Sequence, residues 1–191
     1  MSSPSSSLVD DRARLAQILT KYSVRRGGEY KLASGRISDV YCDARVTTCR
    51  AAAMALIGRL MLAKFAERGW KAQAVGGMSL GADPIVIAVA RESAGTAAEM
   101  NAFLIRKEPK GHGLKRQIEG LSEEQAGSRV VIVDDTCTTG DSTIKAIEAA
   151  REAGLTVLGA VCLVDREEGA REAIEGGLGC PFDRVFRIQE L

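Results

Sequence analysis

Two adjacent carboxylates followed by a turn rich in hydroxyl groups are the residues of this chain best suited to chemistry. Asp134 and Asp135 end the apolar run VVIV, and the stretch TCTTGDS follows them directly. An apolar run of this kind predicts a buried strand, and in a parallel sheet the ligand site lies beyond the carboxyl ends of the strands. Carboxylates accept hydrogen bonds from sugar hydroxyls, and a glycine-containing turn before a helix donates N–H groups to a phosphate. The pattern predicts a site for a ribose 5-phosphate group.

Two other interpretations of this stretch stay open. It could be an ordinary strand-to-helix turn with a helix cap, although Thr and Gly are denser here than capping requires. It could also resemble the acidic pocket of a phospho-accepting receiver domain, whose acids usually lie near the first strand. The common phosphate-binding patterns GxxxxGK[ST] and GxGxxG do not occur in the sequence.

A second candidate is a cationic segment with glycine hinges. Pro109, Gly111 and Gly113 disfavour regular structure, so a mobile loop is expected after a strand. Each charge-assisted contact contributes roughly 1.5–3 kcal/mol, so several together could close this loop over a polyanion such as pyrophosphate. A solvated charged loop is the plainer alternative, and a nucleic-acid patch would need interleaved aromatic residues. The positively charged or titratable members are Arg106, Lys107, Lys110, His112, Lys115 and Arg116.

Strands and helices must alternate to position these segments. The fold class that this alternation predicts is α/β, a mostly parallel central sheet flanked by helices, with a small N-terminal hood. Residues 1–8 are expected to form a disordered tail and residues 9–191 a single domain, of which about 9–45 contribute the hood. Expected strands are 72–77, 101–106, 130–135, 156–165 and 183–188, with two short hood strands around the turn 33–36. Expected helices are 11–24, 49–68, 83–94, 142–154 and 168–177.

Composition excludes several classes of protein. The net charge is +1, from 26 basic and 25 acidic residues, so no global field would hold nucleic acid or an anionic membrane. The most apolar helix is interrupted by Arg59 and Lys64, which argues against a membrane span. The five cysteines form no CxxC pair and indicate a reducing, cytoplasmic setting. We expect most of them to be buried, with Cys137 as the candidate exception.

Several stretches of the sequence resemble the motifs of a known family. The stretch VVIVDDTCTTGDST resembles the phosphoribosyl pyrophosphate (PRPP) motif of type I phosphoribosyltransferases. RKEPKGHG resembles the catalytic loop of the orotate phosphoribosyltransferase family, VGGMSLGADPIVIA its pyrophosphate-loop region, and LASGRISDVY its N-terminal segment. LVDREEG resembles the strand end that carries its orotate-binding arginine. The likeness covers nearly the whole chain after the tail.

The resemblance implies a reaction and a role for each matching residue. The family joins orotate to PRPP, releasing pyrophosphate and orotidine 5′-monophosphate, with Mg²⁺ held mainly through pyrophosphate and no direct protein ligand. It also implies a homodimer whose basic loop reaches into the neighbouring site. Asp134 and Asp135 would hold the ribose hydroxyls, and Thr138 and Arg166 would contact orotate. The PRPP phosphates would meet Thr136, Cys137, Thr138, Thr139, Gly140, Asp141 and Ser142 at the 5′ end, and Arg106, Lys107, Lys110 and His112 at the pyrophosphate end. Catalysis would fall to Lys107, Lys110, His112 and Asp135.

Some positions depart from the family pattern, and two rival functions stay open. Ala33 and Leu80 stand where some relatives have lysine, so Lys31 and Ser79 could serve instead, and Tyr41 could stack on the base or pack in the hood. One rival is a transferase acting on another base, such as uracil or a purine. The other is a PRPP sensor without catalysis that regulates transcription or binds RNA.

Overall fold

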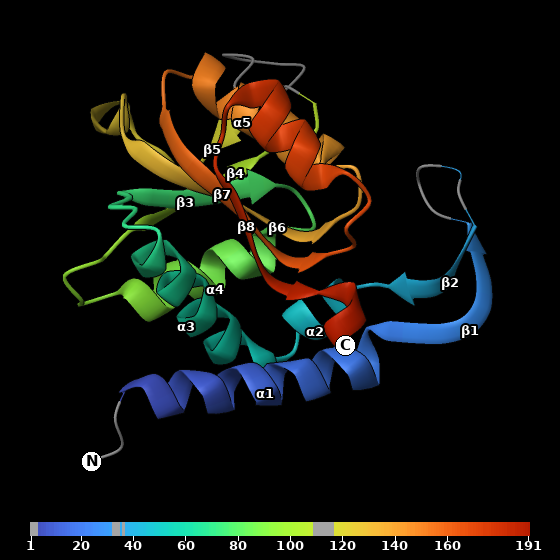
Figure 1. The fold of residues 1–191 in the computed structure, drawn as a ribbon. Coiled ribbons are helices and arrows are strands. Elements are labelled where there is room, and N and C mark those ends of the chain that lie inside the picture. Colours follow the sequence, from blue (N-terminus) through green and yellow to red (C-terminus); the bar gives the residue numbers. More distant parts are fainter. Residues whose placement is uncertain (1–3, 32–34, 36, 109–116) are drawn as a thin grey trace.

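The structure, a computed structural model, describes residues 4–31, 35, 37–108 and 117–191. Its centre is a six-stranded sheet with the strand order β5-β4-β3-β6-β7-β8 (Figure 1). Neighbouring strands are parallel except for β4 and β5, which run antiparallel. The strands are β3 (Ala74–Met78), β4 (Asn101–Ile105), β5 (Ile118–Glu119), β6 (Arg129–Cys137), β7 (Thr156–Asp165) and β8 (Phe182–Arg187). The predicted fold class is therefore confirmed.

The sequence explains why β6 lies at the middle of the sheet. Its residues Val130–Val133 are fully buried, and alternate side chains enter two separate apolar clusters. Val131 and Val133 belong to the cluster on one face, whereas Val130 and Ile132 belong to the cluster on the other. A strand covered on both faces needs such a continuous apolar run. β6 is longer than predicted because its pairing with β7 continues as far as Cys137 and Asp165.

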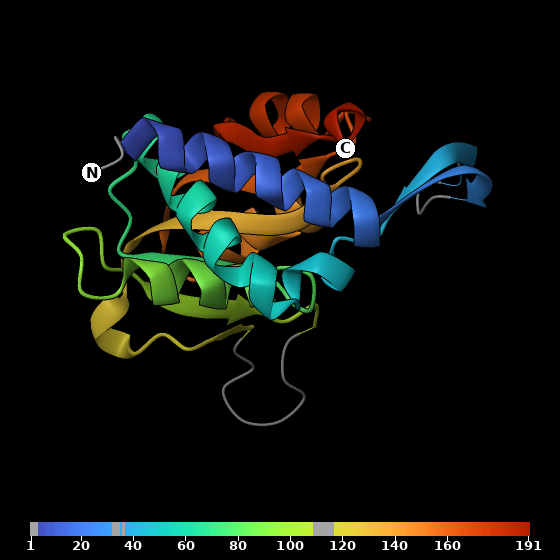
Figure 2. The ribbon, with the colours of Figure 1, turned by 90° about the horizontal axis from the view of Figure 1, so that it is seen from below.

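Helices cover both faces of this sheet (Figures 1 and 2). α1 (Pro4–Tyr22), α3 (Ala51–Glu67) and α4 (Asp83–Ser93) pack on one face, and Figure 2 shows α1 lying across α3. α5 (Asp141–Glu152) and the π-helical segment η2 (Glu172–Gly176) pack on the other. None of the helices in the described part of the chain has the length and apolar character that a membrane crossing requires.

The predicted hood corresponds to α1, a two-stranded antiparallel hairpin and a short helix. The hairpin strands are β1 (Val24–Lys31) and β2 (Ile37–Cys42), and α2 (Arg45–Thr48) follows them. Both views show the hairpin extending beyond the body of the domain (Figures 1 and 2). The Arg26 side chain ties β1 to the last residues of the chain by donating hydrogen bonds to the carbonyls of Ile188 and Leu191, at 3.2 Å each.

The N-terminal boundary differs from the prediction. α1 begins at Pro4, so residues 4–8 of the expected disordered tail are helical. Leu8 is partly buried and packs against the apolar cluster that contains Leu15 and Leu19. This contact gives the first turns of the helix a hydrophobic anchor, which the Ser-rich composition did not indicate.

Candidate functional site

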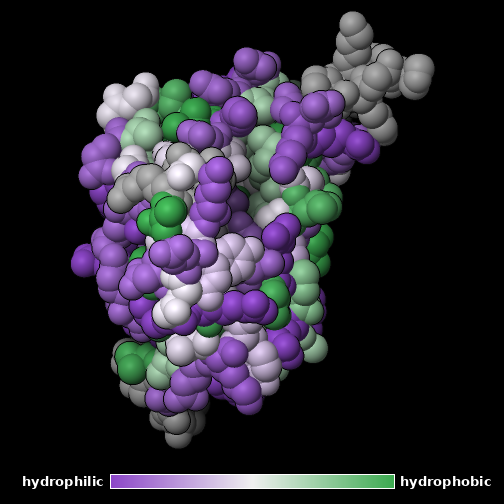
Figure 3. Space-filling view, turned by 90° about the vertical axis from the view of Figure 1, so that its right-hand side faces the viewer, coloured by the Kyte–Doolittle hydropathy of each residue, from purple (hydrophilic) through white to green (hydrophobic). Residues whose placement is uncertain are grey.

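A cavity of about 610 Å³ opens beyond the carboxyl ends of β3, β6 and β7. The side of the molecule toward which the hairpin extends is mostly hydrophilic around a hollow (Figure 3). Four segments from distant parts of the chain line the cavity, which matches the expected position of a ligand site in a parallel sheet. Three of the four parts are residues 41–45 at the β2–α2 junction, 78–81 at the end of β3, and 134–142 from β6 to α5. The fourth part consists of the single residues Lys31, Lys107 and Arg166.

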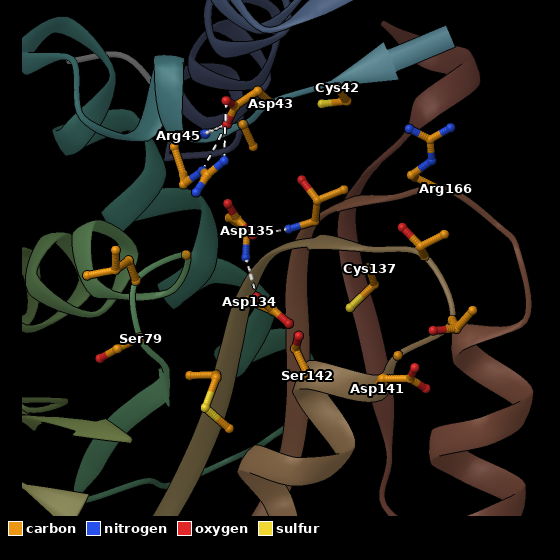
Figure 4. Close-up of a pocket in the computed structure, with 18 of the residues that line it drawn as sticks. Cys42, Asp43, Arg45, Ser79, Asp134, Asp135, Cys137, Asp141, Ser142 and Arg166 are labelled. Carbon is orange, nitrogen blue, oxygen red and sulfur yellow. Dashed lines mark hydrogen bonds and ion pairs between the residues drawn. The ribbon is translucent and has the colours of Figure 1, made fainter. Parts of the chain in front are cut away.

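The two carboxylates at the end of β6 differ in their surroundings (Figure 4). Asp134 is only 5% exposed, and it accepts hydrogen bonds from the Thr143 hydroxyl at 2.8 Å and from the Asp135 N–H at 3.0 Å. Asp135 is half-buried and accepts one from the Thr136 N–H at 2.7 Å. Both groups line the cavity, but Asp135 has more free acceptor capacity for a ligand hydroxyl.

Burial changes the charge state of this pair. Burial, followed by the charge of the neighbouring Asp135, raises the pKa of Asp134 to about 7. Burial also raises the pKa of Asp135, although the Thr136 N–H and then the Arg45 guanidinium oppose that shift. Cationic groups or ligand hydroxyls beside these carboxylates would therefore favour their ionised forms.

The segment after β3 approaches Asp135 closely because Gly81 has no side chain. A Cβ atom at residue 81 would lie 2.8 Å from the Asp135 Oδ1 atom. The Ser79 hydroxyl donates a hydrogen bond to Asp83 at 2.9 Å, and Leu80 is 73% exposed at the edge of the cavity. The Ser79–Leu80 peptide bond is cis.

The turn from Thr136 to Ser142 forms the other wall and leads into α5. Gly140 stands at the N-cap of α5 with φ of 88°, a left-handed conformation that favours glycine. The first N–H groups of a helix have no partner within the helix and can bind an anion. The geometry is therefore compatible with the phosphate contact that the sequence predicted for this turn.

Cys137 is not the exposed thiol that we expected. It is 1% exposed, and its Sγ atom lies 3.1 Å from the Thr143 hydroxyl. The exposed cysteine is instead Cys49, and the other four are buried. Cys137 ends β6 in the apolar cluster that also contains Ala170 and Ile174, and this packing buries its side chain.

Arg166 reaches the cavity from the end of β7, and its side chain is only 5% exposed. Its Nε atom donates to Glu168 at 3.1 Å. Its Nη2 atom donates to the Ser38 hydroxyl at 3.2 Å and to the Val40 carbonyl at 3.0 Å. The hairpin and the sheet thus hold this guanidinium together. A bidentate grip on a ligand carboxylate through both terminal nitrogens would require Nη2 to exchange these contacts.

The predicted basic loop is only partly within the described residues. Lys107 lines the cavity. Arg106 is not among the lining residues, because its guanidinium pairs with Glu119 at 2.9 Å on the adjacent strand β5. Lys110 and His112 lie outside the described residues, so their role stays a prediction.

The sequence reasoning missed a charged pair on the opposite wall. The Nε atom of Arg45 lies 3.0 Å from the Oδ1 atom of Asp43, and both residues line the cavity. The stretch YCDAR shows two charges after a strand, but nothing in it indicates that they face Asp135. Tyr41 also lines the cavity and stacks on Tyr30 with ring centroids 5.5 Å apart.

Comparisons with known proteins give consistent matches. A family model described as "Phosphoribosyl transferase domain" matches residues 51–181. The orotate phosphoribosyltransferase of Aquifex aeolicus is 43% identical over 186 residues, which is 96% of this chain and 99% of that protein. The crystal structure of Mycobacterium tuberculosis orotate phosphoribosyltransferase with Fe(III) dicitrate is 40% identical, has a TM-score of 0.80, and covers 94% of this chain and 98% of its own. A second structure of that enzyme, in complex with PRPP, is 37% identical with a TM-score of 0.76, and it covers 94% of this chain and 98% of its own.

Proposed function

This chain belongs to the orotate phosphoribosyltransferases of the phosphoribosyltransferase family, and we propose that its cavity transfers the 5-phosphoribosyl group of PRPP to orotate. The products are orotidine 5′-monophosphate and pyrophosphate. The observation that carries this proposal is that one cavity brings together the acid pair, the turn before α5 and Arg166. The reaction belongs to de novo pyrimidine (UMP) biosynthesis. We place the protein in the cytoplasm, which suits its free cysteines.

The arrangement suggests how the substrates lie. The 5′-phosphate would occupy the turn from Thr136 to Ser142, next to the N-terminus of α5. The ribose hydroxyls would donate to the half-buried carboxylate of Asp135, and orotate would lie toward Thr138 and Arg166. Arg166 is suited to an anionic base because its guanidinium is charged at every physiological pH.

The residues of the cavity can support the bond exchange. The bond between C1 of the ribose and the diphosphate oxygen breaks, and its electron pair leaves with the diphosphate. A ring nitrogen of orotate forms the new bond to C1 and releases its proton. Positive charge develops on the ribose near Asp135, while negative charge develops on the leaving diphosphate. Lys107 can stabilise the diphosphate, together with Lys110 and His112 of the basic loop. Closure of that loop would exclude water that would otherwise hydrolyse the sugar.

The donor set is compatible with a magnesium ion that arrives with the substrate. Within the described ranges, no group of three or more His, Cys, Asp or Glu side chains is arranged to hold a metal ion. Mg²⁺ commonly binds through one or two carboxylates together with substrate phosphates, and Asp135 offers such a carboxylate. When bound, the ion would neutralise charge on the diphosphate.

A homodimer with shared sites is part of the proposal. Three apolar side chains near the cavity are exposed. They are Val46 on α2 (42%), Leu80 at the edge of the cavity (73%) and Ile87 on α4 (50%). Contact with a second copy would bury them.

We expect a mixture of Lys110→Ala and Asp135→Asn proteins to recover activity that neither has alone. If the basic loop of each subunit enters the site of the other subunit, a hybrid dimer has one intact site. Absence of recovery in a confirmed hybrid would argue against shared sites.

The direct test of function is a spectrophotometric assay of orotate consumption. The purified protein should consume orotate only with PRPP and Mg²⁺ present, and chelation by EDTA should stop the reaction. Uracil and hypoxanthine serve as competing bases. Turnover of uracil or hypoxanthine but not orotate would show that the protein acts on another base. Tight PRPP binding without turnover of any base would favour a sensor.

A further inference from the structure

Arg45 is a cation in the cavity to which the proposed reaction has so far given no role. It begins α2, directly after the hairpin, and its side chain is 54% exposed. Within the described chain its guanidinium bonds to Asp43, at 3.0 Å from Nε and 3.4 Å from Nη2. This pairing uses two of the five N–H groups of an arginine. The guanidinium is also close enough to Asp135 to oppose the rise in the pKa of that carboxyl.

The shape of the substrate determines which part of it Arg45 could meet. In PRPP the ribose lies between the 5′-phosphate and the diphosphate on C1. Figure 4 shows Asp135 between two walls, with Asp141 and Ser142 on one side and Arg45 and Ser79 on the other. If the 5′-phosphate occupies the turn before α5 and the ribose meets Asp135, the diphosphate must extend toward the wall that carries Arg45.

The acidic lining of the cavity means that a bound diphosphate needs cations beside it. Asp43, Asp134, Asp135 and Asp141 all line the cavity, and they would repel the diphosphate unless cations faced it. Asp43 holds the Arg45 guanidinium through two nitrogens, which limits its motion before the ligand arrives. An arginine held in this way still has N–H groups for phosphate oxygens.

We propose that Arg45 is a binding residue for the diphosphate group of PRPP and for the pyrophosphate product. The inference rests on the proposed function, because it uses the direction in which PRPP lies in the cavity. It adds a fixed contact on the β2–α2 junction to the contacts expected from Lys107 and the basic loop. Since the hairpin precedes α2 directly, the hood would contribute to diphosphate recognition.

The experiment uses two fragments of the substrate as probes. Isothermal titration calorimetry with pyrophosphate, in the presence of Mg²⁺, and separately with ribose 5-phosphate compares the wild type with Arg45→Ala and Arg45→Lys. Arg91→Ala is the matched control, because Arg91 is 79% exposed on α4 and is not a lining residue. Melting temperatures and circular dichroism confirm that each variant is folded.

Loss of one charge-assisted contact should weaken pyrophosphate binding by Arg45→Ala on the order of 10- to 100-fold. Ribose 5-phosphate binding should change less than about twofold. The pyrophosphate affinity of Arg45→Lys should fall between those of the wild type and Arg45→Ala, because lysine keeps the positive charge but lacks the planar guanidinium that can bind two phosphate oxygens at once. In turnover, the KM for PRPP should rise while the KM for orotate stays constant.

Three outcomes would overturn the inference. If Arg45→Ala binds pyrophosphate as the wild type does, Arg45 makes no contact with it, and the proposed function stands. If both probes weaken equally in a folded variant, Arg45 supports the shape of the cavity through Asp43 rather than binding the diphosphate. If the wild type binds neither probe and does not consume orotate, the proposed function fails as well.

Discussion

Replacing Asp134 with asparagine should stabilise the folded protein above neutral pH while it impairs turnover. Asp134 is 5% exposed, and burial together with Asp135 raises its pKa to about 7 from the ordinary 3.8. Between these two values the folded protein keeps a proton that the unfolded chain has released. The wild-type free energy of unfolding must therefore fall as the pH rises through that window. Asparagine is neutral at every pH and removes this loss.

The size of the effect follows from the change in pKa. A rise of about three pKa units at about 1.36 kcal/mol each gives an upper value of about 4 kcal/mol at pH 8. Asparagine has one acceptor oxygen where the carboxylate has two, so the bond from Thr143 or the one from the Asp135 N–H is lost, at a cost of about 1 kcal/mol. The expected net gain is about 1–3 kcal/mol, which for a chain of this size raises Tm by roughly 2–12 °C.

Urea unfolding followed by circular dichroism at pH 4.5 and pH 8 measures this difference. The advantage of Asp134→Asn should be present at pH 8 and should disappear, or reverse, at pH 4.5. Glu148→Gln is the matched control, because it makes the same kind of carboxyl-to-amide change at an exposed position on α5. Equal effects of Asp134→Asn at both pH values, or destabilisation that grows with pH, would refute the assignment of a costly buried charge.

Three further predictions concern the cavity. Gly81→Ala should lower kcat/KM for PRPP by at least tenfold with the fold retained, because the added Cβ would lie 2.8 Å from the Asp135 carboxylate; unchanged kinetics would show that the segment moves freely. Arg166→Ala should raise the KM for orotate by about 10- to 100-fold but leave the KM for PRPP nearly constant, since it removes a charged partner of the base; an equal rise in both would contradict that role. Ser38→Ala should raise the KM for orotate by about two- to fivefold through loss of one of the contacts that orient the Arg166 guanidinium, and no change would show that the Val40 carbonyl and Glu168 suffice.

Much of the sheet could be predicted because each central strand is an uninterrupted apolar run between helical patterns. The strand 156–165 was predicted with the bounds that the structure shows, and the acid pair was correctly placed at a carboxyl edge. These features depend on local sequence and on the rule that ligand sites in parallel sheets lie at that edge. The two-residue strand β5 was missed because so short a segment has no periodicity.

The parts of the site that were not predicted depend on tertiary contacts. Arg45 and Asp43 share the cavity with Asp135 only because α2 packs against α1, α3 and α4, and the local sequence does not indicate these tertiary contacts. The burial of Cys137 follows from its tertiary packing in the apolar cluster that includes Ile174 of η2. The pairing of Arg106 with Glu119 requires the antiparallel strand β5, so a basic residue in a loop-like stretch was assigned to the ligand.

The hold of the hairpin on Arg166 has a consequence for engineering. The Ser38 hydroxyl and the Val40 carbonyl contact this guanidinium from strand β2, more than 120 positions earlier in the chain. A directed-evolution library aimed at a different nucleobase should therefore randomise the hairpin as well as the end of β7. Libraries restricted to the neighbourhood of Arg166 in sequence would leave its contacts with Ser38 and Val40 unsampled.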